Sequence, residues 1–82
     1  MNHLINKLEK ITLWPKKPRD KQMVIRWLSE KFEFEKQYSE KEVNRIIQQY
    51  HSFDDIPLLR RELISRSFLN RKNDGSLYWK NK

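Results

Sequence analysis

The sequence contains no cysteine, only one glycine and three prolines, and no long apolar run. Without cysteine the chain cannot form disulfides or a thiolate metal site, so its fold depends on packing alone. A single glycine argues against flexible linkers and excludes a glycine-rich phosphate loop. No segment approaches the roughly 20 apolar residues of a membrane span, and none resembles a signal peptide. We therefore expect a cytoplasmic protein with no membrane partner.

The 82 residues are enough for one small core, so we predict a single domain over residues 1–82. Only 37% of the residues are hydrophobic, but they include three Trp, three Tyr and four Phe. Each of these aromatic side chains can bury a large area. The predicted core is therefore built from few but large side chains.

The formal net charge is +7, and it is unevenly distributed along the chain. Residues 1–29 hold seven basic and two acidic side chains, and residues 60–82 hold the same numbers. Residues 30–55 between them hold four basic and seven acidic side chains. A large positive charge favours polyanionic partners such as nucleic acid, although it can also serve solubility alone.

Two amphipathic helices are predicted in the first part of the chain. The first lies within residues 1–13 and carries an apolar stripe made of Leu4, Ile5, Leu8 and Ile11. Pro15 pushes Trp14 out of the helical region and ends this helix. A basic connector follows, which contains Lys16, Lys17 and Arg19. The second helix is predicted to begin with Asp20 as its N-cap and to end near Phe32.

Two further helix starts have clear signals. Ser39 and Glu42 have the spacing of a capping box, and a short extended segment is predicted before them between Phe34 and Tyr38. The stripe of the third helix is Val43, Ile46, Ile47 and Tyr50. Asp54 and Asp55 suit the N-terminus of a fourth helix over residues 54–67, in which Pro57 is tolerated in the first turn.

A β-hairpin is predicted over residues 69–80, because the short strand candidates 68–71 and 76–79 flank the turn signal Asp74-Gly75. The predicted fold class is therefore α+β and mainly helical. It is a winged helix-turn-helix over residues 14–80, with an extra N-terminal helix and the C-terminal hairpin as wing.

Several short sequence motifs support this interpretation. They are Trp14-Pro15, Tyr38-Ser39-Glu40, Glu42-Val43-Asn44, Leu59-Arg60-Arg61-Glu62-Leu63, Leu69-Asn70-Arg71, Asp74-Gly75-Ser76 and Tyr78-Trp79. In this combination, over about residues 14–80, the chain resembles the bacterial domain of unknown function 2087. The resemblance implies a small winged-helix-like domain that occurs alone or behind a helix-turn-helix of the arsenic-repressor type in transcriptional regulators. In the second setting the domain would be an accessory or partner-binding module.

No catalytic, cofactor or metal site is predicted, so we do not expect an enzyme. His3 and His51 lack further ligands at metal-binding spacing and are expected on the surface. Most aromatic residues lie on or beside the apolar stripes and are assigned to the core; they are Trp14, Trp27, Phe32, Tyr50, Phe53 and Phe68. Tyr78 and Trp79 must point to opposite faces of their strand, so one is expected under the wing and the other partly exposed.

The functional hypothesis is a DNA-binding or transcription-associated protein that presents helix 54–67 to the major groove of duplex DNA. Helical spacing places Leu58, Arg61 and Ser65 on the outward face. Backbone contacts are assigned to Arg71, Lys72 and Lys80 of the hairpin and to Lys16, Lys17 and Arg19. Arg60 falls at the edge of the core, where we expect a structural ion pair with Glu42 or Asp54.

Two alternatives remain open at this stage. A protein-interaction or dimerisation module would use the stripe of Leu4, Ile5, Leu8 and Ile11 together with Leu58 to bind a protein partner or a second copy. RNA binding is less favoured, because the sequence has no RNA-recognition signature.

Overall fold

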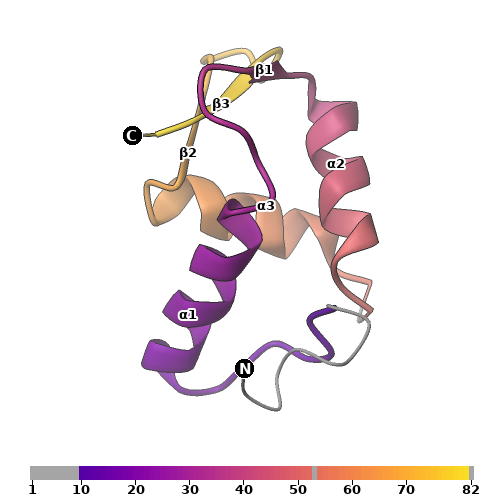
Figure 1. The fold of residues 1–82 in the computed structure, drawn as a ribbon, viewed down its shortest axis with the longest axis vertical. Helices are drawn as coiled ribbons and strands as arrows, with labels where there is room; N and C mark the ends of the chain where they lie inside the picture. Colours follow the sequence, from indigo (N-terminus) through magenta and orange to yellow (C-terminus); the bar gives the residue numbers. More distant parts are fainter. Residues whose placement is uncertain (1–9, 53, 82) are drawn as a thin grey trace.

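The computed structural model describes residues 10–52 and 54–81, which form a small, mainly helical α+β domain (Figure 1). The elements are α1 (Pro18–Ser29), β1 (Gln37–Tyr38), α2 (Glu40–Gln49), α3 (Ile56–Ser65), β2 (Leu69–Arg71) and β3 (Tyr78–Lys80). None of the helices in these ranges is both long and apolar enough to cross a membrane.

The strands form an antiparallel sheet at one end of the molecule, in the order β1-β3-β2 (Figure 1). α1 and α2 lie on opposite sides of the view, and α3 crosses behind them. α3 contacts α1, α2 and β2, so it is the element on which the rest of the domain is assembled.

One hydrophobic core joins the three helices to the sheet. Leu59 and Leu63 of α3 are fully buried in it. The other aliphatic side chains without exposed surface are Ile11, Val24, Ile25, Leu28, Val43, Ile47 and Leu69. Burial of one such side chain contributes about 1.5–3 kcal/mol, so this set can hold the fold without disulfides.

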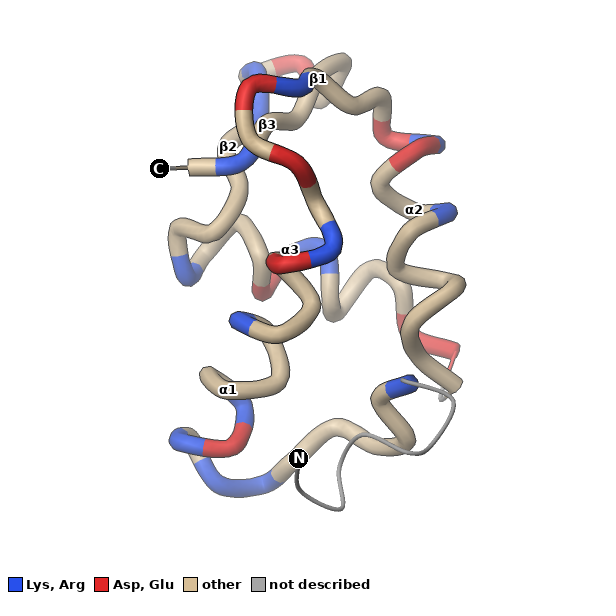
Figure 2. Tube along the Cα trace, in the orientation of Figure 1, with Lys and Arg blue, Asp and Glu red and all other residues tan. Residues whose placement is uncertain are grey.

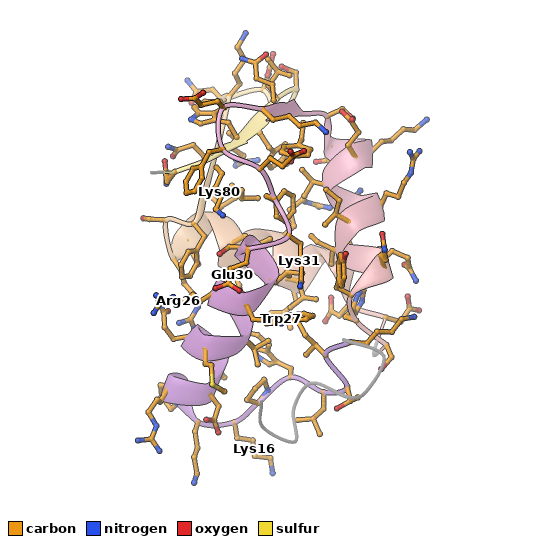
Figure 3. All side chains as sticks on the ribbon, in the orientation of Figure 1. Lys16, Arg26, Trp27, Glu30, Lys31 and Lys80 are labelled. Carbon is orange, nitrogen blue, oxygen red and sulfur yellow. The ribbon has the colours of Figure 1, made fainter. Side chains whose placement is uncertain are left out.

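The aromatic residues assigned to the core are buried or partly buried where the structure describes them, and Phe53 lies outside the described residues. Trp27 of α1 and Tyr50 after α2 meet edge to face with ring centroids 5.8 Å apart. Lys31 lies over both rings, 4.5 Å from the centroid of Trp27 and 5.2 Å from that of Tyr50. Figure 3 shows Lys31 beside Trp27 at the end of α1. This cluster joins α1 to the end of α2.

α1 begins earlier than predicted. Its N-cap is Lys17 and Pro18 occupies the first turn, whereas Asp20 lies inside the helix instead of capping it. Proline has a preset φ and no N–H to satisfy, which suits a first helical position. The helix ends at Ser29 instead of Phe32, although the N–H of Phe32 still donates to the carbonyl of Ser29 in a tightened last turn.

The capping box at the start of α2 is confirmed. The N–H of Glu42 donates to Ser39 Oγ at 3.1 Å, and the N–H of Ser39 donates to Glu42 Oε1 at 2.9 Å. The hydrogen bonds from Ser39, first that of its backbone, hold the pKa of the Glu42 carboxyl below its usual range. The extended segment predicted before this cap is present as β1.

α3 also begins as its sequence signals predict. Asp55 is the N-cap and its Oδ1 accepts from the N–H of Leu58 at 3.2 Å, while Pro57 lies in the first turn. The helix ends at Ser65, slightly before the predicted end at residue 67, where Ser67 has a φ of 65°. A positive φ cannot continue a right-handed helix, so the chain turns there into β2.

The hairpin lies where it was predicted, with its strands shifted by one or two residues. The register pairs Arg71 with Tyr78 and Asn70 with Trp79. Gly75 in the turn has a φ of 75°, a conformation that L side chains rarely adopt. Next to it, Asp74 Oδ1 accepts from the N–H of Ser76 at 2.9 Å, which lowers the pKa of the Asp74 carboxyl.

The prediction of an N-terminal helix is wrong for its last residues. Residues 1–9 lie outside the described residues, but residues 10–13 are not helical. Ile11 instead forms a parallel β-bridge with His51: its N–H donates to the carbonyl of Tyr50 at 2.8 Å and its carbonyl accepts from Ser52 at 3.0 Å. In this extended conformation the side chain of Ile11 enters the core, where it has no exposed surface.

We expect Ser39→Ala to lower the free energy of unfolding by about 1 kcal/mol, because it removes the side-chain cap of α2. Denaturant unfolding followed by circular dichroism measures this change. Ser65→Ala, at an exposed position inside α3, is the matched control and should not destabilise the domain. Equal losses in both variants would contradict a stabilising role for the cap.

Candidate nucleic-acid interface

One face of α3 is directed away from the core. Arg61 and Ser65 are exposed and Leu58 is partly exposed, while Leu59 and Leu63 on the other side of the helix are fully buried. The three outward residues are those that helical spacing assigns to DNA. The structure thus places them together on one accessible surface.

Arg60 is partly buried, with 23% of its side chain exposed, and does not have the predicted partners. Its Nη1 donates to Asn44 Oδ1 at 2.6 Å, and its Nε lies 3.9 Å from Glu40 Oε1. Glu42 is instead engaged in the capping box, and Asp54 is an exposed residue before α3. The guanidinium therefore joins α3 to Glu40 and Asn44, which lie in the first half of α2, instead of to Glu42 or Asp54.

A groove of about 420 Å³ lies between α3 and the sheet. Its lining residues come from both helices of the α2–α3 pair and from the hairpin; they are Glu40, Arg60, Arg61, Ile64, Ser65, Arg71 and Tyr78. Three arginines and a single carboxylate give this groove a positive charge. An anionic group such as a phosphate is the ligand that such a lining favours.

Tyr78 is the buried residue of the groove lining. Its hydroxyl donates to Glu40 Oε1 at 3.1 Å. Burial raises the pKa of the Tyr78 phenol, and the hydrogen bond to the Glu40 carboxylate raises it further. Arg71, which pairs with Tyr78 across the hairpin, also hydrogen-bonds this phenol and acts in the opposite direction. The turn end of the two hairpin strands is thereby connected to the first turn of α2.

Sequence reasoning missed Glu40, Asn44 and Tyr78 as parts of this site. The alternation of Tyr78 and Trp79 did predict that one of them is buried, and Tyr78 is the buried one at 1% exposure. The positions of Glu40 and Asn44 have a weaker signal: they are four residues apart and so share one face of α2. Nothing in the sequence indicated that Arg60 would contact that face.

Lys80 is separated from the arginines of the groove. Its Nζ donates to the carbonyl of Phe32 at 3.3 Å and lies 4.3 Å from the ring centroid of Phe34. Figure 3 shows Lys80 beside the segment that links α1 to β1. Lys72, by contrast, is exposed where β2 enters the turn.

Lys16, Lys17 and Arg19 form a second basic group. They lie just before and at the start of α1, and Figure 2 shows this basic run at the end of the molecule opposite to the sheet. The long axis of the molecule is 34 Å. The residues assigned to DNA therefore occupy separate regions and not one continuous patch.

The prediction that His51 lies on the surface is wrong, because only 2% of the residue is exposed. His3 lies outside the described residues. The N–H of Asp55 donates to His51 Nε2 at 3.1 Å, so this nitrogen accepts and Nδ1 carries the proton. His51 Nδ1 then donates to the carbonyl of Ile47 at 2.6 Å. The signal was present in the sequence, since His51 continues, just after the end of α2, the four-residue spacing of the buried residues Val43 and Ile47.

These features define the class of the protein as a small basic α+β domain with an arginine-lined groove. Over residues 10–80 the sequence matches the family described as "Uncharacterized protein conserved in bacteria (DUF2087)". The match covers nearly the whole chain, and the protein belongs to this family. Neither a curated protein nor a solved structure matches this chain.

Arg60→Ala should reduce the free energy of unfolding by about 1–3 kcal/mol, because it removes a hydrogen bond to Asn44 and leaves partly buried polar groups without their partner. Arg61→Ala, one residue further on and exposed, should leave the melting temperature unchanged. Thermal unfolding of the two variants makes the comparison. A larger loss at Arg61 than at Arg60 would contradict these orientations.

His51→Phe should destabilise the domain by about 1–3 kcal/mol, since a ring of similar shape remains but both hydrogen bonds are lost. His51→Ala should cost more, because it also leaves a cavity. Urea denaturation at neutral pH gives both values. If His51→Phe is as stable as the natural protein, the two hydrogen bonds do not hold the corner between α2 and α3.

Proposed function

We propose that this protein is a non-enzymatic, transcription-associated DNA-binding domain that presents α3 to the major groove of duplex DNA. The observation that carries this proposal is the groove between α3 and the hairpin, into which Arg60, Arg61 and Arg71 converge. A basic groove beside an exposed helix face suits the phosphate backbone that borders a major groove.

The topology supports assigning the domain to the winged helix-turn-helix class. α2 and α3 pack on each other and are joined by a short connection, and the hairpin follows directly. β1 pairs with β3, so the hairpin is part of a three-stranded sheet, and we propose that this hairpin is the wing. In such domains the second helix of the pair is the one that enters the major groove.

Roles are proposed for the individual residues from their positions. Arg61 is the candidate for contact with a base edge, because arginine is the commonest reader of guanine and this one is exposed at the centre of the outward face. Arg71 and Lys72 would contact phosphates from the hairpin. Phosphate contacts position a protein on DNA but do not read the DNA sequence.

The basic group at the start of α1 would provide a second backbone contact. It lies at the end of the molecule opposite to the sheet, and the whole molecule, 34 Å long, is about as long as one turn of duplex DNA (Figure 2). Lys80 Nζ donates to the carbonyl of Phe32, so we assign Lys80 a smaller role in duplex binding than its sequence position suggested.

The proposal predicts binding to duplex DNA at about 50 mM salt, with an affinity that falls steeply as salt rises because bound counterions are released. Arg61→Ala should weaken binding about 5- to 100-fold on a preferred sequence. Fluorescence anisotropy with labelled duplexes measures both effects.

Arg26→Ala is the matched control, because Arg26 is an exposed arginine on α1 and lies outside the groove. It removes the same charge and should change the affinity much less. Equal effects of the two substitutions would show that only net charge matters. The absence of any anisotropy change at low salt would overturn the proposal.

A further inference from the structure

The sheet has a second face, opposite to the one that covers the core. Tyr78 points inward and is buried, so its neighbour Trp79 points to the outer face, where it is partly exposed. The register pairs Trp79 with Gln37 on one side and with Asn70 on the other. An indole thus lies in the central strand, with a side-chain amide on each neighbouring strand.

An open hollow of about 890 Å³ adjoins this face. Trp79 and Leu77 provide its apolar surface, and the remaining lining residues are Glu35, Lys36, Gln37, Lys72, Lys80 and Asn81. Three lysines against one carboxylate make the hollow basic. It shares no lining residue with the arginine groove, so the two are distinct sites.

We propose that this hollow binds single-stranded DNA, with an unpaired base stacked on the indole of Trp79. The choice of DNA rests on the proposed function, since a strand that leaves a duplex bound on α3 would be DNA. The use of Trp79 as a stacking surface does not depend on it. Aromatic side chains on a sheet face, combined with a basic groove, are the general means of binding unpaired nucleotides.

The positions of the lysines fit this occupant. Lys36 precedes β1 and Lys72 follows β2, so they flank the central strand β3 that carries Trp79. Lys36 Nζ is 3.5 Å from Glu33 Oε2 and 5.1 Å from the ring centroid of Tyr38, but the side chains of Lys36 and Glu33 are more than half exposed, and such surface pairs are weak. A base on the indole would therefore have a cation on either side for the phosphates of its strand.

Gln37 adds a group that can distinguish a base from a simple apolar ligand. Its exposed amide lies directly across from Trp79 and both donates and accepts hydrogen bonds. The exposed edge of a stacked base offers the complementary groups. An apolar peptide would bury this amide and the surrounding lysines without partners.

The test measures the affinity of the full chain for three labelled 12-mers: oligo-dT, an abasic strand with the same number of phosphates, and oligo-rU. We expect oligo-dT to bind at least about 5-fold more tightly than the abasic strand, because stacking acts only on bases. Trp79→Leu should abolish this preference, whereas Trp79→Phe should retain most of it. Lys72→Ala should weaken oligo-dT and abasic binding by the same factor.

Leu13→Ala is the control, because Leu13 is a large hydrophobic residue with 49% exposure that lies before α1 and does not line the hollow. It should leave oligo-dT binding unchanged. Circular dichroism verifies that each variant is folded, and Trp79→Phe provides the measurement if Trp79→Leu unfolds: it should then bind oligo-dT like the natural protein.

Equal binding of oligo-dT and the abasic strand, or an unchanged preference in folded Trp79→Leu, would overturn the stacking site. Tighter binding of oligo-rU than of oligo-dT would overturn the assignment to DNA. Arg61→Ala separates this site from the proposed duplex interface: it should weaken duplex binding and not oligo-dT binding. If the natural protein binds oligo-dT in a Trp79-dependent way but does not bind duplex DNA, the proposed function is overturned and this site is supported.

Discussion

The corner between α2 and α3 is the constraint on which the rest of the structure depends. His51 ends the buried face of α2 and connects the carbonyl of Ile47 to the N–H of Asp55, the N-cap of α3. Ile11 pairs with the same residue from the other side. These contacts satisfy backbone groups at two adjacent helix ends, where orphan donors and acceptors would otherwise be buried. The direction of α3, and with it the exposure of Arg61, follows from this corner.

The arrangement of charge also follows from the fold. Acidic residues are concentrated in the middle of the sequence, but Glu40 and Glu42 have different structural tasks. Glu42 stabilises the start of α2, whereas Glu40 holds the Tyr78 hydroxyl and lies near Arg60. A carboxylate inside an arginine-lined groove reduces repulsion between the arginines when no ligand is bound. In the proposed function, a phosphate would have to compete with Glu40 for Arg60, whose Nε lies 3.9 Å from Glu40 Oε1.

Local signals predicted the fold class, and contacts between distant segments account for what they missed. The capping box of Ser39 and Glu42, the Asp55 cap and the Asp74-Gly75 turn are each encoded within a few residues, so the elements they start were predictable. Ile11 shows the limit: its spacing fits a helix, yet its backbone bonds are made with residues some 40 positions away.

The same distinction applies to the site. Helical spacing separated Arg60 from Arg61, because both positions lie on one helix whose core face is evident. The partner of Arg60 and the environments of His51 and Lys80 depend on which other elements pack nearby. The basic residues show this well: charge counts along the chain do not indicate that Lys16 and Lys80 lie in different regions (Figure 3).

The central strand of the sheet has a further consequence. β3 is only three residues long, and its consecutive residues Tyr78 and Trp79 serve opposite faces. A one-residue slip of β3 against its neighbouring strands would exchange the two side chains, placing the phenol in solvent and the indole in the core. Both faces would then be altered by a single event, and the hairpin would lose its attachment to α2. Insertions and deletions in natural variants should therefore be confined to the turn before Leu77 and should not occur in β3.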